Sequence, residues 1–305
     1  MLCELHALGS HPVLTWALLS ALGVVAVALM SGSVFLAYYA RPTYEQWTRK
    51  LNPAYPSAGA VRDEVLQTLK GLLTATICPA ASLALAQRGL SRAYCGLPDG
   101  HTASEQVLAF FAIWVACDFY EWGYHWVGHT LPWFWAQHRP HHVFYNPSPF
   151  AVIADDMLDQ FVRSAPLLLL PLLAPVNIDL LFFTFVIFFY GYGTYLHWGH
   201  ESAYLSAHQP LVNGAYEHYY HHAKATLKTG PMFTGFFFKL WDNLAGSVPP
   251  AGSPCLCSRC EAAAGRRSPA AWRKLAKPDY SNLLSLKFWL SGEDAAAAPA
   301  AKRAD

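Results

Sequence analysis

Residues 118–142 read DFYEWGYHWVGHTLPWFWAQHRPHH, and residues 197–222 carry a similar set of closely spaced histidines. The first stretch contains an HxxxH motif followed by an HxxHH motif, and the second stretch ends in another HxxHH motif. On a helix, side chains three or four residues apart share a face, so each motif can point its imidazoles at one centre. Ten of the chain's 14 histidines belong to these motifs: His125, His129, His138, His141, His142, His197, His200, His218, His221 and His222.

The number of these histidines predicts a site for two metal ions. Neutral imidazole is the commonest metal ligand in proteins, and it suits iron, zinc, copper and nickel. Two groups of about five imidazoles exceed the four ligands that a single structural zinc ion requires. His208 lies outside the motif spacing, so we interpret it as a surface residue.

The composition is typical of an integral membrane protein. Hydrophobic residues make up 54% of the 305 residues and charged residues only 13%, whereas an average soluble domain is about 25% charged. The net charge is +1, which gives no indication of a nucleic-acid partner. The seven cysteines form no regular framework, and this argues against a disulfide scaffold.

Several apolar runs reach the length of about 20 residues that a membrane span needs. These runs are residues 12–40, 65–86, 106–127 and 165–196. The last run is too long for one span and contains Pro171, Pro175 and Asp179, so we expect a helical hairpin that turns between Pro175 and Asp179. The predicted fold is all-α, a polytopic integral membrane protein with about four to five membrane segments, one of them a hairpin.

Such a hairpin returns the chain to the side of the membrane that it left, which brings both histidine-rich stretches to the same side. Short loops rich in Lys and Arg stay in the cytoplasm, and the loop of residues 41–62 carries Arg41, Arg49, Lys50 and Arg62. We therefore expect a histidine-rich lobe for two metal ions that faces the cytosol.

The chain divides into three predicted parts. Residues 1–105 form an N-terminal transmembrane region, residues 106–250 form a catalytic domain, and residues 251–305 form a C-terminal tail. We expect this tail to be partly disordered because it is rich in Ala, Pro and Arg. It contains Cys255, Cys257 and Cys260, which could bind zinc. We interpret them as part of a loop because the sequence indicates no fourth ligand.

Asp118 is a candidate partner of a metal-bound histidine. It precedes His125 by seven residues and lies on roughly the same helical face. An acidic residue in a membrane segment is a functional candidate, and carboxylates often accept the second ring N–H of a metal-bound imidazole. The alternative is a helix end at the membrane interface, where Asp118 would contact lipid headgroups.

The motifs resemble the fatty acid hydroxylase superfamily of integral-membrane oxygenases, and in particular its sterol desaturase branch. The resemblance covers residues 118–247 and includes the three ordered histidine motifs, PSPFA at residues 147–151 and LWDNLAGS at residues 240–247. It implies an O2-dependent oxidoreductase with two iron ions bound by the ten histidines. It also implies electrons from NAD(P)H through cytochrome b5, a lipid substrate, most closely a sterol desaturated at C-5 in sterol biosynthesis, and location in the endoplasmic reticulum membrane.

One pair of residues departs from this branch. Its members usually carry a His-Pro pair after PSPFA, where this chain has Asp156 and Met157. Asp156 is therefore a second candidate partner of a metal-bound imidazole. An alternative function is hydroxylation of another lipid, such as a fatty acyl chain, a sphingoid base, a C-4 methylsterol or a carotenoid. An alternative of another class is a metal transporter or sensor, which is expected to place its ligands near the bilayer midplane.

Overall fold

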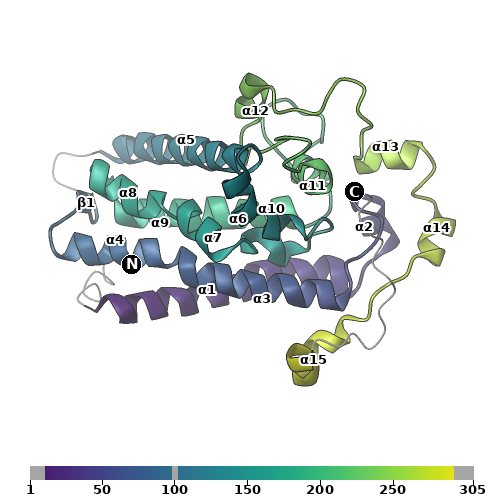
Figure 1. Ribbon diagram of the computed structural model, residues 1–305, viewed down its shortest axis with the longest axis horizontal. Helices are drawn as coiled ribbons and strands as arrows, with labels where there is room; N and C mark the ends of the chain where they lie inside the picture. The colour runs from purple at the N-terminus through teal and green to yellow at the C-terminus, as the bar shows by residue number, and fades with distance from the viewer. Residues whose placement is uncertain (1–10, 98–101, 292–305) are drawn as a thin grey trace.

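The structure is a computed structural model that describes residues 11–97 and 102–291. The described part is helical apart from two short strands, β1 (Ala93–Tyr94) and β2 (Val176–Asn177), which pair in parallel. This confirms the prediction of a helical fold. The long helices run along the long axis of the molecule, and shorter helices fill the space between them and cover one end (Figure 1).

The first two apolar runs form long helices that pack against each other in opposite directions (Figure 1). Helix α1 (Pro12–Phe35) continues through the π-helical turn η2 (Leu36–Ala40), and the short helix α2 (Tyr44–Thr48) follows. Helix α3 (Ala58–Ala75) begins where the Ser57 hydroxyl accepts a hydrogen bond from the backbone N–H of Ala60, at 3.1 Å. Helix α4 (Ile77–Gln87) extends the same run after a break at Thr76.

The third apolar run belongs to helix α5 (Ala103–Gly128), whose start and end follow from its sequence. Thr102 and Glu105 form a reciprocal capping box at the N-terminus. His125 lies in the last turn and His129 caps the C-terminus. Helix α6 (Pro132–His142) starts three residues later, at a proline whose missing N–H costs no helical hydrogen bond there.

The predicted hairpin is present. Its first arm is helix α8 (Pro166–Leu173), and its turn contains strand β2. The second arm is a continuous helical stretch of α9 (Ile178–Phe183), the π-helical η4 (Thr184–Gly191) and α10 (Tyr192–His197). This arm returns to the end of the molecule where α5 finishes (Figure 1). Both histidine-rich stretches therefore lie at the same end, as one shared site requires.

Three helical stretches in the described part are long and apolar enough to cross a membrane. They are Pro12–Ala40, Ala58–Gln87 and Ile178–His197. Helix α5, which the sequence predicts as a further span, is long enough at 26 residues but is not among the stretches that are apolar enough. The second half of α5 carries Asp118, Glu121 and His125, which lower its apolar character.

The remaining elements are η3 (Pro149–Ile153), α7 (Met157–Arg163), α11 (Ala215–Lys224), α12 (Lys239–Ala245), α13 (Ser258–Ala263), α14 (Pro269–Lys274), η5 (Tyr280–Leu284) and α15 (Leu286–Ser291). Of these elements, η3, α7 and α11 lie within the body of the molecule, whereas α12 lies at the top of Figure 1, α13 and α14 at the right and α15 below the bundle.

The C-terminal tail is more ordered than its composition suggests. Up to residue 291 it packs on the rest of the chain, and Arg267 and Phe288 are both buried. The Arg267 guanidinium donates hydrogen bonds to the carbonyls of Lys50 and Leu51, at 2.6 and 2.9 Å. Residues 292–305, to which the expectation of disorder also applied, lie outside the described residues.

A close contact between α3 and η3 positions one side of the histidine site. A Cβ atom at Gly71 would lie 2.5 Å from the carbonyl oxygen of Ile153, so only glycine allows this approach. The Gln67 amide donates a hydrogen bond to the carbonyl of Asp155, and the Thr68 hydroxyl donates one to the carbonyl of Phe150. The segment that follows PSPFA is therefore fixed against α3.

Candidate metal centre

Four helices bring nine of the ten predicted histidines together in the interior. Two come from the end of α5, three from the last turns of α6, one from the end of α10 and three from α11. All nine are buried. Residues far apart in the sequence therefore form one cluster, as the motif spacing predicts.

The nine imidazoles form two adjacent groups, and within each group the candidate ligand nitrogens lie within 4.8 Å of one another. The first group contains His125, His129, His138, His142 and His221. The second group contains His141, His197, His218 and His222. The rings of His142 and His222, one from each group, have centroids 5.0 Å apart. Each group thus contains histidines from both histidine-rich stretches, and the two groups lie side by side.

Backbone carbonyls fix the orientation of three of these rings. The Nδ1 atoms of His125, His197 and His221 lie 2.7–2.8 Å from the carbonyl oxygens of Thr234, Gly193 and Met232, respectively. A carbonyl oxygen only accepts hydrogen bonds, so in each ring Nδ1 carries the proton. The lone pair of each Nε2 atom therefore remains free to bind a metal ion.

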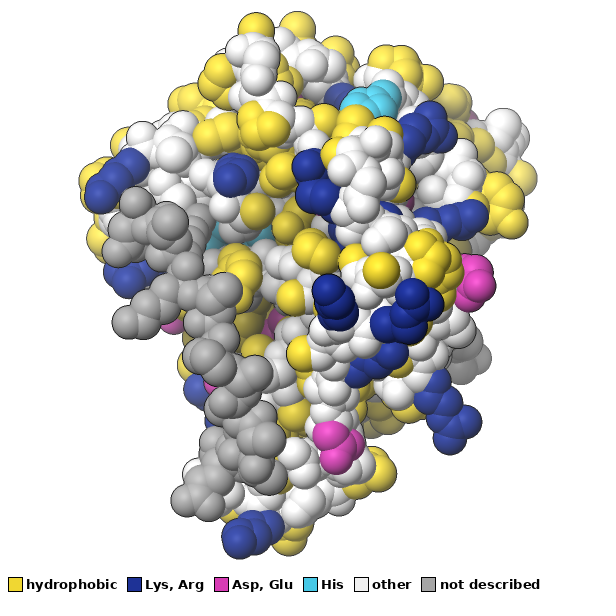
Figure 2. Space-filling model, turned by 90° about the vertical axis from the view of Figure 1, so that its right-hand side faces the viewer, with side chains coloured by type: hydrophobic (Ala, Val, Ile, Leu, Met, Phe, Trp, Pro, Cys, Tyr) yellow, Lys and Arg dark blue, Asp and Glu magenta, His cyan; other side chains and the backbone are white. Residues whose placement is uncertain are grey.

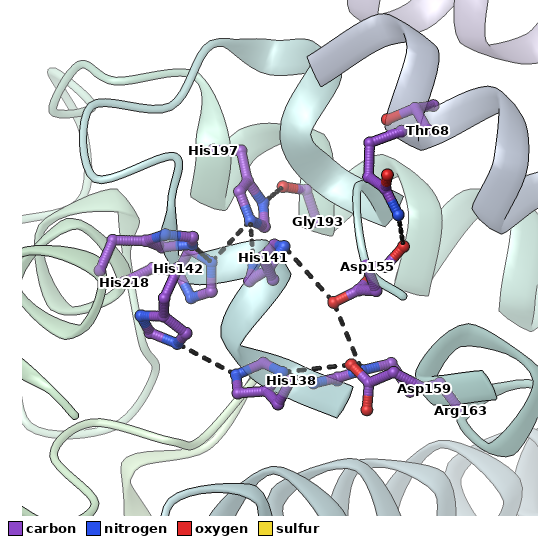
Figure 3. Close-up of polar contacts among 12 residues, drawn as sticks. Thr68, His138, His141, His142, Asp155, Asp159, Arg163, Gly193, His197 and His218 are labelled. Carbon is purple, nitrogen blue, oxygen red and sulfur yellow. Dashed lines mark hydrogen bonds and ion pairs between the residues drawn. The ribbon is translucent and has the colours of Figure 1, made fainter. Parts of the chain in front are cut away.

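Two carboxylates lie beside further histidines on the opposite side. His138 donates from Nδ1 to Asp159, at 3.1 Å, and the Nδ1 atom of His141 lies 3.4 Å from Asp155 (Figure 3). Arg163 donates to Asp159 at 3.3 Å and so holds its carboxylate in place. Carboxylates in this position fix the tautomer of a metal-bound imidazole and raise its basicity.

The Nε2 atoms of these rings are suited to bind metal ions, because hydrogen bonds among the rings cannot provide a partner for every lone pair. In the first group, the Nε2 atom of His142 lies 3.0 Å from the Nε2 atoms of both His138 and His221. These two partners are protonated at Nδ1, and one proton on His142 could serve only one of them. Burial lowers the pKa of His138, His142 and His221 well below the usual range, so the rings are neutral. A cation between them would satisfy the remaining lone pairs.

The second group has the same arrangement. The Nε2 atom of His197 lies 2.8 Å from that of His218 and 3.3 Å from that of His141. The Nε2 atom of His222 lies 3.1 Å from that of His218. His218 can donate one proton at most to these two neighbours when it is neutral. The residues present therefore fit a pair of metal ions, one in each group.

Three predicted site residues lie elsewhere. His200 belongs to neither group, because its ring packs against Tyr38 and Tyr39 and its Nδ1 atom lies 3.0 Å from the carbonyl of Trp198. Asp118 accepts hydrogen bonds from the backbone N–H of Phe237 and other groups of the segment around it, not from an imidazole.

Asp156, the third, caps helix α7 by accepting a hydrogen bond from Leu158 at 2.9 Å. Its neighbours Asp155 and Asp159 contact the histidines instead. Sequence reasoning missed both. The spacing of four residues between Asp159 and Arg163 indicates a shared face of α7, but Asp155 precedes this helix and no local pattern marks it.

An apolar cavity of about 350 Å³ ends on both groups of histidines. Its walls come mainly from α1, α5 and η4, with further residues from α3 and α8, and include Leu19, Leu72 and Phe189. Its inner end reaches His125, His141, His197 and His218.

Polar groups occur in this cavity close to the histidines. Glu121 forms an ion pair with Arg163 there. The buried Oε1 atom of Gln160 has no hydrogen-bond partner among the described residues. The cavity can therefore take a largely apolar molecule whose one polar group lies near the histidines.

Residues 110–247 match the family model of the fatty acid hydroxylases. The chain is 28% identical to a Δ7-sterol 5(6)-desaturase of Gibberella zeae over 58% of this chain and 49% of the relative. It is also 28% identical to the lathosterol oxidase of Homo sapiens, over 61% and 60% of the two chains. A third relative, a Δ7-sterol 5(6)-desaturase of Candida dubliniensis, is 37% identical over 37% of this chain and 26% of its own.

These matches confirm the resemblance to the fatty acid hydroxylase superfamily and to its sterol desaturase branch. The chain spans about half the length of the Δ7-sterol 5(6)-desaturases of Gibberella zeae and Aspergillus fumigatus. No solved structure gives a significant match to this chain.

Proposed function

We propose that this protein is a membrane-bound diiron oxidoreductase that introduces a C-5 double bond into a Δ7-sterol. O2 is the oxidant, and NAD(P)H supplies electrons through cytochrome b5. Two hydrogens leave C-5 and C-6 of the sterol, and with two further electrons and two protons they reduce O2 to two water molecules. The observation that carries this proposal is the apolar cavity that ends on both groups of histidines.

The polar groups at the inner end of the cavity favour a sterol over a long acyl chain. In a sterol the hydroxyl at C-3 is separated from C-5 by a single carbon, so the one polar atom lies close to the reacting bond. Gln160 and the Glu121–Arg163 pair lie in the cavity with the histidines and offer hydrogen-bond partners to such a hydroxyl. In a fatty acyl chain the polar end is remote from the carbons that desaturases oxidise.

The chain's own residues position the substrate and exclude water. The first group of histidines would hold one iron ion and the second group the other, and the bound iron would supply the activation of O2 that attack on an unactivated C–H bond requires. Leu19, Leu72 and Phe189 surround the apolar body of the substrate. Asp159 holds His138 in the orientation that presents Nε2, and Asp155 lies beside the Nδ1 atom of His141.

The proposed protein crosses the endoplasmic reticulum membrane with about four to five segments and exposes its histidine-rich lobe to the cytosol. Lys and Arg side chains are spread over the end of the molecule that carries α13 and α14, with few acidic side chains between them (Figure 2). Arg273, Lys274 and Lys277 are among the exposed ones. A basic face favours the cytosolic side and would attract an acidic electron donor such as cytochrome b5.

The proposal is tested by expressing the chain in a cell that lacks sterol C-5 desaturation and measuring its sterols. We expect Δ5,7-sterols to appear with the wild-type chain. They should be absent with His141→Ala or His221→Ala, because each substitution removes one imidazole from a different group. If correctly inserted protein oxidises a fatty acyl or sphingoid lipid and not the sterol, the proposed substrate is wrong. The assignment to the superfamily would still hold.

A further inference from the structure

A second cluster of metal-binding side chains lies apart from the nine histidines. It joins His208, in the loop between α10 and α11, to Cys255, Cys257 and Cys260 in the C-terminal segment. The sequence alone indicates that His208 is a surface residue and that the cysteines form a loop without a fourth ligand. The structure brings His208 to the cysteines, about 50 residues away in the sequence, and so supplies that ligand.

The distances in this cluster match a tetrahedral zinc site. The Nε2 atom of His208 lies 3.7 Å from the Sγ atom of Cys255 and 3.5 Å from that of Cys257. With Zn–S bonds of about 2.3 Å and Zn–N bonds of about 2.0–2.1 Å, tetrahedral angles place sulfur and nitrogen about 3.6 Å apart. All four ligand atoms lie within 4.8 Å of one another, and the three cysteines are free thiols.

Backbone hydrogen bonds prepare two of the sulfur atoms to bind a cation. The N–H of Cys257 points at the Sγ atom of Cys255, at 3.5 Å, and the N–H of Cys260 points at that of Cys257, at 3.4 Å. Donors of this kind stabilise the thiolate form, which is the form that binds metals. Cys257 is only 1% exposed, so its sulfur lies inside the fold.

We propose that these four residues bind a structural zinc ion. Three thiolates and one imidazole are a common zinc ligand set, and four protein ligands leave no open position for catalysis. The ion would link the His208 loop to the C-terminal segment beside α11. Cys257 packs in the same apolar cluster as Ala215, Tyr216 and Tyr220 of α11, so the zinc site stabilises the helix that carries three histidines of the metal centre. This inference does not depend on the reaction proposed above.

The test measures zinc in the full-length protein, which is purified in detergent under reducing conditions. An organomercurial is added, because it displaces zinc from thiolates but not from imidazoles, and the released zinc is counted. We expect the mercurial to release about one zinc ion per wild-type chain and to lower the thermal unfolding midpoint. Cys257→Ser and His208→Ala should lose most of this zinc. Cys117→Ser is the matched control because it removes another buried free thiol, and it should retain the zinc.

His221→Ala should also retain the mercurial-released zinc, which separates this site from the histidine centre. If the cysteine variants do not fold, cobalt loaded into the wild-type protein provides the second measurement, because tetrahedral cobalt–thiolate sites absorb strongly in visible light. The proposal is wrong if the mercurial releases no zinc and cobalt gives no thiolate spectrum. A disulfide among these cysteines in freshly reduced, metal-exposed protein would also overturn it.

Discussion

Asp159 and Asp156 lie three residues apart but have different partners: Asp159 contacts His138, and Asp156 caps helix α7. Helical spacing identified the histidines, because residues three or four apart share a face wherever the helix lies. It could not identify their partners, since Asp155 and Asp159 reach His141 and His138 from another element. The family comparison pointed to Asp156, which is one residue away from the contact and caps a helix instead.

Substitutions of Asp by Asn test this assignment with the same chemical change at neighbouring positions. Asp159→Asn removes the charge that holds His138, and we expect turnover to fall about 10–100-fold. Asp156→Asn should leave turnover nearly unchanged, because asparagine caps helices as well as aspartate does. Turnover of both variants is measured in membranes at matched protein level. Equal losses would show that the two carboxylates do not differ in role.

The next scale is that of the helices. Apolar runs predicted the long helices and the hairpin, because length, hydropathy and proline positions are local properties. They did not predict that α3 begins at Ala58, where a serine cap and an amphipathic first half extend the helix beyond its apolar part. They also gave α5 as a span, although its polar second half forms one wall of the metal centre.

The close approach of α3 to η3 leads to a prediction about Gly71. Gly71→Ala places a methyl group against the carbonyl of Ile153, so we expect the free energy of unfolding to fall by about 1–3 kcal/mol. Gly32→Ala in α1 is the matched control, because nothing lies within 4 Å of the added Cβ atom. It should be neutral or stabilise by up to about 1 kcal/mol. Thermal unfolding in detergent measures both, and a Gly71→Ala protein as stable as wild type would contradict the contact.

At the scale of the whole molecule, two features were beyond sequence reasoning for different reasons. The composition of residues 251–291 suggests disorder, yet this segment packs through scattered residues such as Cys257, Arg267 and Phe288 that match surfaces elsewhere in the chain. The cavity forms between many elements that are far apart in the sequence, so no single stretch encodes it. The sequence predicted that both histidine stretches lie at one end because the prolines in residues 165–196 indicate a helical hairpin, and the structure brings the two stretches together.

The orientation of the protein in the membrane can be tested with glycosylation acceptor sites. Tyr204 is 97% exposed in the loop between α10 and α11, and an Asn-x-Ser acceptor introduced there should remain unmodified on the cytosolic side. An acceptor at Leu97, near the opposite end of the helices, should be glycosylated in the lumen. Each site is read from the mobility of the protein before and after deglycosylation. The reverse pattern would overturn the proposed topology.

The central claim, that two adjacent groups of histidines each hold one metal ion, is tested most directly by counting the iron bound to purified protein. Protein loaded under anaerobic conditions and treated to remove thiolate-bound metal should contain about two iron ions per chain. His129→Ala and His218→Ala, which alter the first and second group respectively, should each lose about one ion, and the double variant about two. A single iron ion in the wild-type protein, or two ions retained after both substitutions, would contradict the account.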